Sequence, residues 1–212
     1  MMVDKKKVTD AISKALEDKG KRKFSQSVEF IVNFRGIDFA KAENRLNLDI
    51  LLPKGKGKEQ KVMVFADGQV ALDAKNAGAN EVVDNAGILK MAQDRKKVKI
   101  IAKQHEFIAQ PNMMVNVGKS LGQVLGAKGK LPRPIIGATK DAVDAAKRRV
   151  RLASKGKYLP VAQCVIGSES MSADELAENF AAVYEKVAAK VLEPNIKSVY
   201  VKLSMGAPVK VA

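Results

Sequence analysis

Hydrophobic residues near the N-terminus recur with two different spacings. Between Val8 and Leu16 they lie three or four positions apart, which predicts an amphipathic helix that ends near Gly20. Over Val28–Phe34 apolar residues occupy every second position, which predicts a strand with one apolar face. Leu46–Leu52 predicts a second strand.

The C-terminal part of the chain likewise combines a helix pattern with a strand pattern. Ser172 and Glu175 form a capping box, which predicts the start of a helix. Its apolar stripe runs to Val191, and Pro194 stops it. Val199–Leu203 then predicts a final strand. The elements of both chain ends can bury their apolar faces if the helices pack on one face of an antiparallel sheet, which is an α+β arrangement.

The middle of the chain alternates strand-like and helix-like segments instead. The expected strands are 61–66, 81–83 and 105–109, and the expected helices are 68–77, 86–96 and one that starts at Pro111. This alternation predicts βαβ units and a parallel sheet.

Two passages rich in glycine and lysine, 54–58 and 155–157, bracket this middle block. They predict a split α+β domain, made of residues 1–57 and 150–212, into which an α/β domain of residues 58–149 is inserted. A single continuous α/β domain is the alternative. In the two-domain case Gly55 and Gly57 are the expected hinge residues.

The net charge of the chain indicates the class of partner that it binds. Lys and Arg number 38 and Asp and Glu 23, a formal net charge of +15, which favours a polyanion. The basic residues cluster in runs, at 19–23, 54–61, 95–103, 128–133 and 147–157. Residues 169–193 are mainly acidic, so one side of the protein is expected to face away from the polyanion.

Catalytic, metal-binding and membrane signatures are weak. His105, the only histidine, lies in an apolar strand-like run, and Cys164, the only cysteine, lies in the apolar run 161–166, which favours core positions for both. Gly118-Lys119-Ser120 resembles the end of a phosphate-binding loop, but it falls within a helix pattern and Met113 replaces the required glycine. No apolar run reaches the length of a membrane-spanning helix. We therefore expect no enzymatic activity, no cofactor, no metal and no membrane association.

The entry to the first strand carries groups suited to RNA. Lys23 can neutralise a phosphate, Phe24 can stack on a base or sugar, and Ser27 and Glu29 can bond 2′-hydroxyls or base edges. Alternatively, Phe24 is a core residue and Glu29 an ordinary solvent-facing position, and spacing alone favours this second interpretation.

Four segments together resemble the ribosomal protein L-one family, the large-subunit stalk proteins, in its archaeal type. They are the strand entry 23–29, Leu52–Lys58, Leu125–Pro132 and Ser198–Gly206, which have the order and spacing of the family nearly end to end.

The resemblance implies that the inserted domain is Rossmann-like, and it implies an RNA-contacting set. Matched position by position, the set comprises Phe24, Ser27 and Glu29 in the first strand, and Ser198, Ser204, Met205 and Gly206 in the last. Ser27 and Ser204 stand where the family often has threonine, so the hydroxyl is kept and a methyl group is lost.

The resemblance also implies a function. We expect a cytoplasmic constituent of the large ribosomal subunit, monomeric when free, that binds large-subunit ribosomal RNA at the mobile stalk among other ribosomal components. Contact with exit-site tRNA, help in releasing deacylated tRNA, and repression of translation through binding to its own mRNA are further expectations. The alternatives are a nucleotide-using enzyme, a non-specific nucleic-acid or chromatin-type binder, and a basic membrane-surface module.

Overall fold

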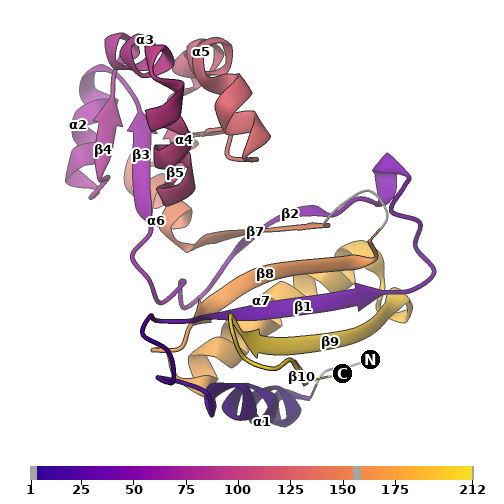
Figure 1. Cartoon of the computed structure of the whole chain (residues 1–212). Helices are drawn as coiled ribbons and strands as arrows, with labels where there is room; N and C mark the ends of the chain where they lie inside the picture. The colour runs from indigo at the N-terminus through magenta and orange to yellow at the C-terminus, as the bar shows by residue number, and fades with distance from the viewer. Residues whose placement is uncertain (1–3, 155–158, 212) are drawn as a thin grey trace. The chain divides into compact units, whose positions relative to one another are not determined.

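The structure is a computed structural model that describes residues 4–154 and 159–211. It forms two compact units (Figure 1): a split unit, Met1–Lys58 with Arg148–Ala212, and an inserted unit, Glu59–Lys147. The sequence placed these bounds at residues 57/58 and 149/150. The passage 155–157, expected at the second crossing, lies outside the described residues, and the chain returns to the split unit already at Arg148.

A six-stranded antiparallel sheet forms the split unit. Its strands in chain order are β1 (Ser27–Phe34), β2 (Asn47–Leu51), β7 (Arg149–Ser154), β8 (Val161–Ser168), β9 (Ile196–Leu203) and β10 (Val209–Lys210). In space their order is β10-β9-β1-β8-β7-β2, so β1 lies in the centre between β8 and β9. The short 3-10 turn Ala42–Asn44 precedes β2.

Two helices, α1 (Lys5–Leu16) and α7 (Ala173–Val191), pack on one face of this sheet (Figure 1). The apolar stripe of α1 is buried, as its spacing predicted, and the alternate residues Val28, Phe30, Val32 and Phe34 of β1 point into the same core. The rings of Phe30 and Phe180 meet edge to face with their centroids 5.1 Å apart. The predicted arrangement of helices on an antiparallel sheet is confirmed.

The start of α7 is fixed by the predicted capping box. The backbone N–H of Glu175 donates to Ser172 Oγ at 3.3 Å, and the backbone N–H of Ser172 donates to Glu175 Oε2 at 3.0 Å. That backbone hydrogen bond lowers the pKa of the Glu175 carboxyl. Since the lowered pKa belongs to the folded state, the stabilisation from this carboxylate is complete above the ordinary pKa of 4.5 and is lost as the pH falls through the folded value.

Ser172→Ala is expected to lower the free energy of unfolding of the split unit by about 1 kcal/mol, because it leaves an N-terminal donor of α7 without its cap. Urea unfolding at neutral pH measures the loss. The deficit relative to wild type should narrow in acid, where the carboxylate half of the box is lost from both proteins. A deficit that grew in acid would contradict this account.

The inserted unit contains a parallel sheet with the spatial order β4-β3-β5-β6. Its strands are β3 (Lys61–Phe65), β4 (Glu81–Val83), β5 (His105–Ala109) and β6 (Arg133–Pro134). Its helices are α2 (Gly68–Asn76), α3 (Asn85–Gln93), α4 (Arg95–Gln104), α5 (Met114–Ala127, preceded by the 3-10 turn Pro111–Met113) and α6 (Thr139–Arg148). Residues of α3, α4 and α5 form one apolar core with Met63 and Phe65, and residues of α2 and α6 form another with Val62 and Val64. Helices therefore cover both faces of the sheet.

The structure corrects three expectations. The predicted helix 86–96 is two helices, α3 and α4, because Asp94 leaves the helical conformation and its carboxylate accepts the Lys97 N–H at 3.1 Å. Strand β9 is not final, since β10 pairs with it beyond a turn. The segments that form β6, α6, β7 and β8 carried no predicted element, although β8 and β7 are the two strands that lie between β1 and β2 in the sheet.

Candidate nucleic-acid interface

The sheet of the split unit has a second face, opposite α1 and α7, which Figure 1 shows towards the viewer. Ser27, Glu29, Ile31 and Asn33 of β1 lie on it and are half-buried. Register places Glu29 beside Lys202 and Ile31 beside Tyr200 of β9, while Gln163 of β8 flanks Ile31 on the other side. This open face therefore offers carboxylate, amide, ammonium and phenol groups in rows.

At one end of the open face, β1 and β9 join through Ser27 and Ser204. The Ser204 N–H donates to the Ser27 carbonyl at 3.0 Å, and the Ser27 N–H donates to Ser204 Oγ at 3.3 Å. Ser204 Oγ is also 3.5 Å from Glu29 Oε1. These two serines and Glu29, predicted from opposite ends of the chain, thus form one polar cluster.

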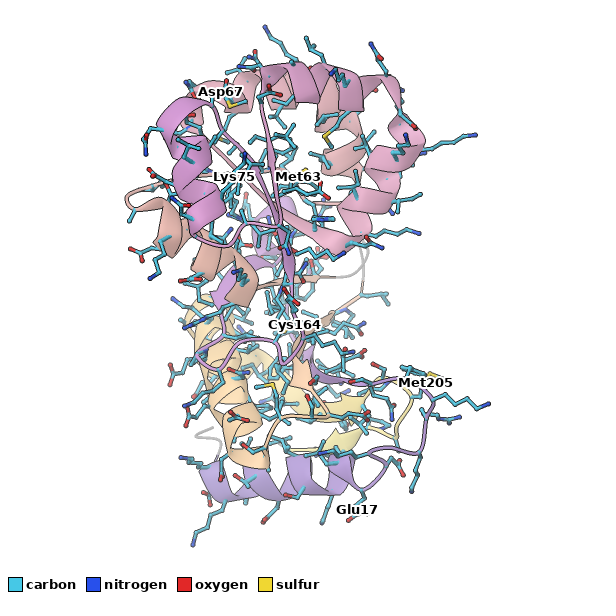
Figure 2. The ribbon with its side chains drawn as sticks, turned by 90° about the vertical axis from the view of Figure 1, so that its left-hand side faces the viewer. Glu17, Met63, Asp67, Lys75, Cys164 and Met205 are labelled. Carbon is cyan, nitrogen blue, oxygen red and sulfur yellow. The ribbon has the colours of Figure 1, made fainter. Side chains whose placement is uncertain are left out.

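The turn after β9 presents Met205 outward. Its backbone N–H donates to Oε1 of the buried Gln26 at 3.1 Å, while its side chain is 60% exposed and lies at the outer edge of the unit (Figure 2). Gly206 closes the turn by donating its N–H to the Leu203 carbonyl at 3.0 Å. A Cβ on Gly206 would lie only 3.1 Å from Leu203 Cβ, so the tight turn favours glycine.

Phe24 is 53% exposed, on the bend that precedes β1. The interpretation of Phe24 as a core residue, which spacing alone favoured, is therefore wrong. Its neighbour Lys23 is exposed as well. An exposed aromatic ring next to a cation is the combination that stacks on a base while neutralising a phosphate.

Two further cations border the serine cluster, and the sequence did not single out either of them. Lys58 Nζ donates to the Ser25 carbonyl at 2.7 Å and lies 3.4 Å from Ser27 Oγ. Lys202 Nζ donates to the Ser204 carbonyl at 3.1 Å. The sequence could have indicated Lys202 as a neighbour of Ser204, because it lies two residues before Ser204 on the same strand face. The position of Lys58 beside the cluster depends on tertiary structure.

Ser198 lies apart from this cluster. It is six residues before Ser204 on β9, about 20 Å at roughly 3.3 Å per residue, and it is only 7% exposed. Asn33 Nδ2 donates to its hydroxyl at 3.0 Å. Ser198 and Asn33 therefore mark the opposite end of the open face.

The expected hinge glycines, Gly55 and Gly57, both have positive φ, of 71° and 66°. Asn179, fully buried on α7, donates through Nδ2 to the Gly55 carbonyl at 2.9 Å and to the Ile166 carbonyl at 2.8 Å, and its Oδ1 accepts the Lys54 N–H at 3.0 Å. Ser168 Oγ donates to the Gly57 carbonyl at 3.2 Å. The segment 54–57 is thus bound to the split unit along its length.

Residues considered for catalysis are placed as core or helix residues. His105 is 3% exposed, with Nδ1 3.2 Å from the Ile101 carbonyl oxygen, and Gly118-Lys119-Ser120 lies inside α5 rather than after a strand. Among residues 4–154 and 159–211, no group of three or more His, Cys, Asp and Glu side chains could hold a metal ion. In the same ranges no helix is long and apolar enough to cross a membrane.

Cys164 is buried in the core of the split unit, as predicted, and burial raises the pKa of its thiol to about 12. We expect a thiol-specific reagent to leave the native protein unlabelled at mildly alkaline pH, because the reactive thiolate is scarce and the sulfur inaccessible. The same reagent should label one thiol per chain after unfolding in guanidinium. Rapid labelling of the native protein would contradict the buried position.

The chain matches known proteins over its length. A family model described as "Ribosomal protein L1p/L10e family" matches residues 13–207. A protein named "Large ribosomal subunit protein uL1" from Thermofilum pendens is 44% identical over 96% of this chain and 92% of its own length. Proteins of the same name from Archaeoglobus fulgidus and Pyrococcus abyssi are 38% and 37% identical, each over 100% of this chain and over 100% and 98% of their own lengths.

These relatives are archaeal ribosomal proteins rather than enzymes, in agreement with the resemblance seen in the sequence. The family match spans β1 to β9, and the Archaeoglobus fulgidus relative matches the whole chain. The chain therefore belongs to the ribosomal protein L1p/L10e family.

Proposed function

We propose that this protein is a constituent of the large ribosomal subunit that binds ribosomal RNA of the stalk through the open face of its split unit. The observation that carries the proposal is the cluster of Ser27, Glu29 and Ser204, flanked by the exposed side chains of Phe24 and Met205. Hydroxyl and carboxylate groups can form hydrogen bonds with the 2′-hydroxyls and amino groups of a folded RNA. A protein that only neutralises phosphates does not need such groups.

Cations around the cluster support an RNA partner in particular. Lys23 is exposed, and Lys58 and Lys202 hold their ammonium groups against backbone carbonyls beside Ser27 and Ser204. Ammonium groups held in this way can meet phosphates on either side of the groups that read the 2′-hydroxyls. A polar cluster with exposed apolar side chains and cations beside it is the arrangement expected for site-specific RNA recognition.

The finer parts of the function rest on the same interface. An mRNA segment that folds like the stalk RNA would meet the same groups, so we propose that the protein can also repress translation of its own message by binding it in competition with ribosomal RNA. We further propose that the protein contacts exit-site tRNA, and helps to release deacylated tRNA, through basic runs of the inserted unit such as 95–103. The free protein is proposed to be monomeric.

The architecture that we propose is the two-domain one, with the inserted unit of Rossmann-like type. Its parallel order β4-β3-β5-β6, with helices on both sheet faces, supports that type. Motion between the domains about the segment 54–57 remains a prediction.

Gly55→Ala tests the hinge prediction more directly than a substitution of Gly57 does. Its Cβ would meet only Arg148 Cγ at 4.0 Å, whereas a Cβ on Gly57 would lie 2.6 Å from Ser168 Oγ. If Gly55 is a hinge, Gly55→Ala should narrow the range of interdomain arrangements, because an L-residue is strained at its φ of 71°. Small-angle scattering measures this range, and a profile identical to that of the wild type would count against a hinge at Gly55.

The function is tested by binding of the protein to a stalk-region ribosomal RNA fragment and to a duplex DNA of equal charge, across a salt series. We expect a preference for the RNA that persists at high salt, because the contacts to 2′-hydroxyls and bases do not depend on counterion release. Equal binding to both polymers, lost steeply with salt, would indicate a non-specific polycation. Saturable binding of a nucleotide, or flotation with anionic vesicles, would favour the other two alternatives.

A further inference from the structure

Glu169 is a buried, charged side chain that the proposed RNA contacts do not use. It directly follows β8 and is only 9% exposed. Its carboxylate oxygen Oε2 is buried and has no hydrogen-bond partner within residues 4–154 and 159–211, and no salt bridge in these ranges includes Glu169. A carboxylate oxygen removed from water without a hydrogen bond is costly, and few native proteins keep one unless it has a function.

Glu169 lies at the end of the sheet that carries the proposed RNA contacts. Because β1 runs antiparallel to both β8 and β9, the start of β1 meets the ends of these two neighbours (Figure 1). Gln26, the residue before β1, joins the two ends. Its carbonyl accepts the Glu169 N–H at 3.0 Å, and its Oε1 accepts the Met205 N–H at 3.1 Å. Glu169 therefore flanks the entry to β1 on the β8 side, as Met205 flanks it on the β9 side.

The groups around Glu169 are accessible to an RNA that docks at the entry to β1. Ser170, the next residue, and Ser25 are exposed. Ser27, which pairs with the last residue of β8, belongs to the proposed RNA contacts. Lys58 Nζ lies 3.4 Å from the hydroxyl oxygen of Ser27, so a phosphate can be neutralised close to this end of β8.

The chemistry of a carboxylate selects a hydrogen-bond donor as its partner. An ionised carboxylate only accepts hydrogen bonds and repels phosphate, so the groups of an RNA that suit it are base amino groups and 2′-hydroxyls. Since Oε2 of Glu169 has no partner among the described residues, turning towards such a donor breaks none of its hydrogen bonds. A donor on the RNA would therefore satisfy a group that the rest of the fold leaves unsatisfied.

We infer that Glu169 is a further specificity-determining residue of the RNA interface, whose carboxylate accepts a hydrogen bond from a base amino group or a 2′-hydroxyl of the stalk RNA. The inference rests on the proposed function, because it requires the RNA to dock at the entry to β1. The acidic segment 169–193 then does not lie wholly away from the RNA, since its first residue contacts it.

Glu169→Gln tests the inference in the full-length protein, because it removes the charge and keeps the size of the side chain. It should weaken binding to the stalk-region ribosomal RNA fragment by at least about fivefold across the whole salt series, since a charge-assisted hydrogen bond is lost. General electrostatics predict the opposite sign, because the substitution makes the protein more positive. Glu185→Gln, at an exposed position of α7, is the matched control: it changes the charge equally and should bind RNA at least as tightly as the wild type.

Modified RNAs identify the donor. In a set of stalk fragments, each lacks one base amino group or one 2′-hydroxyl. At least one modification should cost the wild type several-fold in affinity and cost Glu169→Gln clearly less, because the variant has already lost the partner. Without RNA, the urea midpoint of Glu169→Gln should equal or exceed that of the wild type, because the substitution removes a buried charge without a hydrogen bond.

Failure of the proposed function and failure of this inference give different results. A wild type that does not prefer the stalk RNA over duplex DNA overturns the proposed function and this inference with it. If that preference holds, equal RNA affinities of Glu169→Gln and Glu185→Gln overturn this inference alone, as does a set of modified RNAs in which none is coupled to Glu169. A lower urea midpoint for Glu169→Gln would assign the carboxylate a structural role. A midpoint that Mg²⁺ raises in the wild type but not in Glu169→Gln would assign it to a cation, and either result also overturns the inference.

Discussion

Met205→Asp is expected to weaken binding to the stalk RNA by roughly 100-fold, equivalent to about 2.7 kcal/mol. The Met205 side chain is exposed while its backbone N–H is bonded to Gln26, so the substitution places a carboxylate on the proposed RNA interface without disturbing the fold. A charge there repels phosphate and removes an apolar contact. Titration of labelled RNA at moderate salt measures the effect.

Leu159→Asp is the matched control, since it puts the same charge on another exposed apolar position of the split unit. Leu159 precedes β8, at the end of the sheet away from Ser204. Its affinity for RNA should fall only about two-fold, through long-range repulsion. Phe24→Ala should lose roughly ten-fold, as expected when one base loses its stacking partner. Equal losses in Met205→Asp and Leu159→Asp would reduce the interface to general electrostatics.

Asn179→Ala is expected to lower the free energy of unfolding of the split unit by about 3 kcal/mol, because three hydrogen bonds at about 1 kcal/mol each are lost in a buried place. The groups left behind are the Lys54 N–H and the carbonyls of Gly55 and Ile166. In the variant, the segment that leads to the inserted unit is no longer hydrogen-bonded to the side chain of residue 179 on α7.

Intrinsic tyrosine fluorescence is a selective probe for this measurement. The chain has no Trp, and none of its three tyrosines falls within Glu59–Lys147, the inserted unit; Tyr184 and Tyr200 lie in the described part of the split unit. Urea unfolding followed by tyrosine emission should show the loss for Asn179→Ala and a change of less than about 0.5 kcal/mol for Glu185→Gln, an exposed position of the same helix. A change for Asn179→Ala as small as that for Glu185→Gln would mean that water replaces the lost hydrogen bonds.

The sheet of the split unit has helices on one face only. Residues of β1 that alternate along the strand are divided between the core and the open face, so a single strand both anchors the fold and carries Ser27 and Glu29. Helix α7, on the core side of the sheet, carries four acidic and two basic residues, and α1 on the same side carries four lysines and one aspartate.

Local patterns by themselves determined much of the fold. Alternation fixed which residues of β1 are buried, the capping box fixed the start of α7, and the spacing from Val8 to Ala15 fixed the buried stripe of α1. Each is a property of a few neighbouring residues, so the sequence alone carries it. The residues proposed to contact RNA came instead from resemblance, since spacing alone favoured a core position for Phe24.

Only the tertiary structure decided which of these residues meet. Ser27 and Ser204 are 177 residues apart in sequence and share hydrogen bonds, while Ser198, six residues from Ser204, lies at the opposite end of the open face. Asn179 showed no signal within α7, because its three partners come from distant segments. Local sequence fixes the direction of a side chain within its own element, whereas the pairing of distant strands depends on the summed packing of the whole core, which no short window contains.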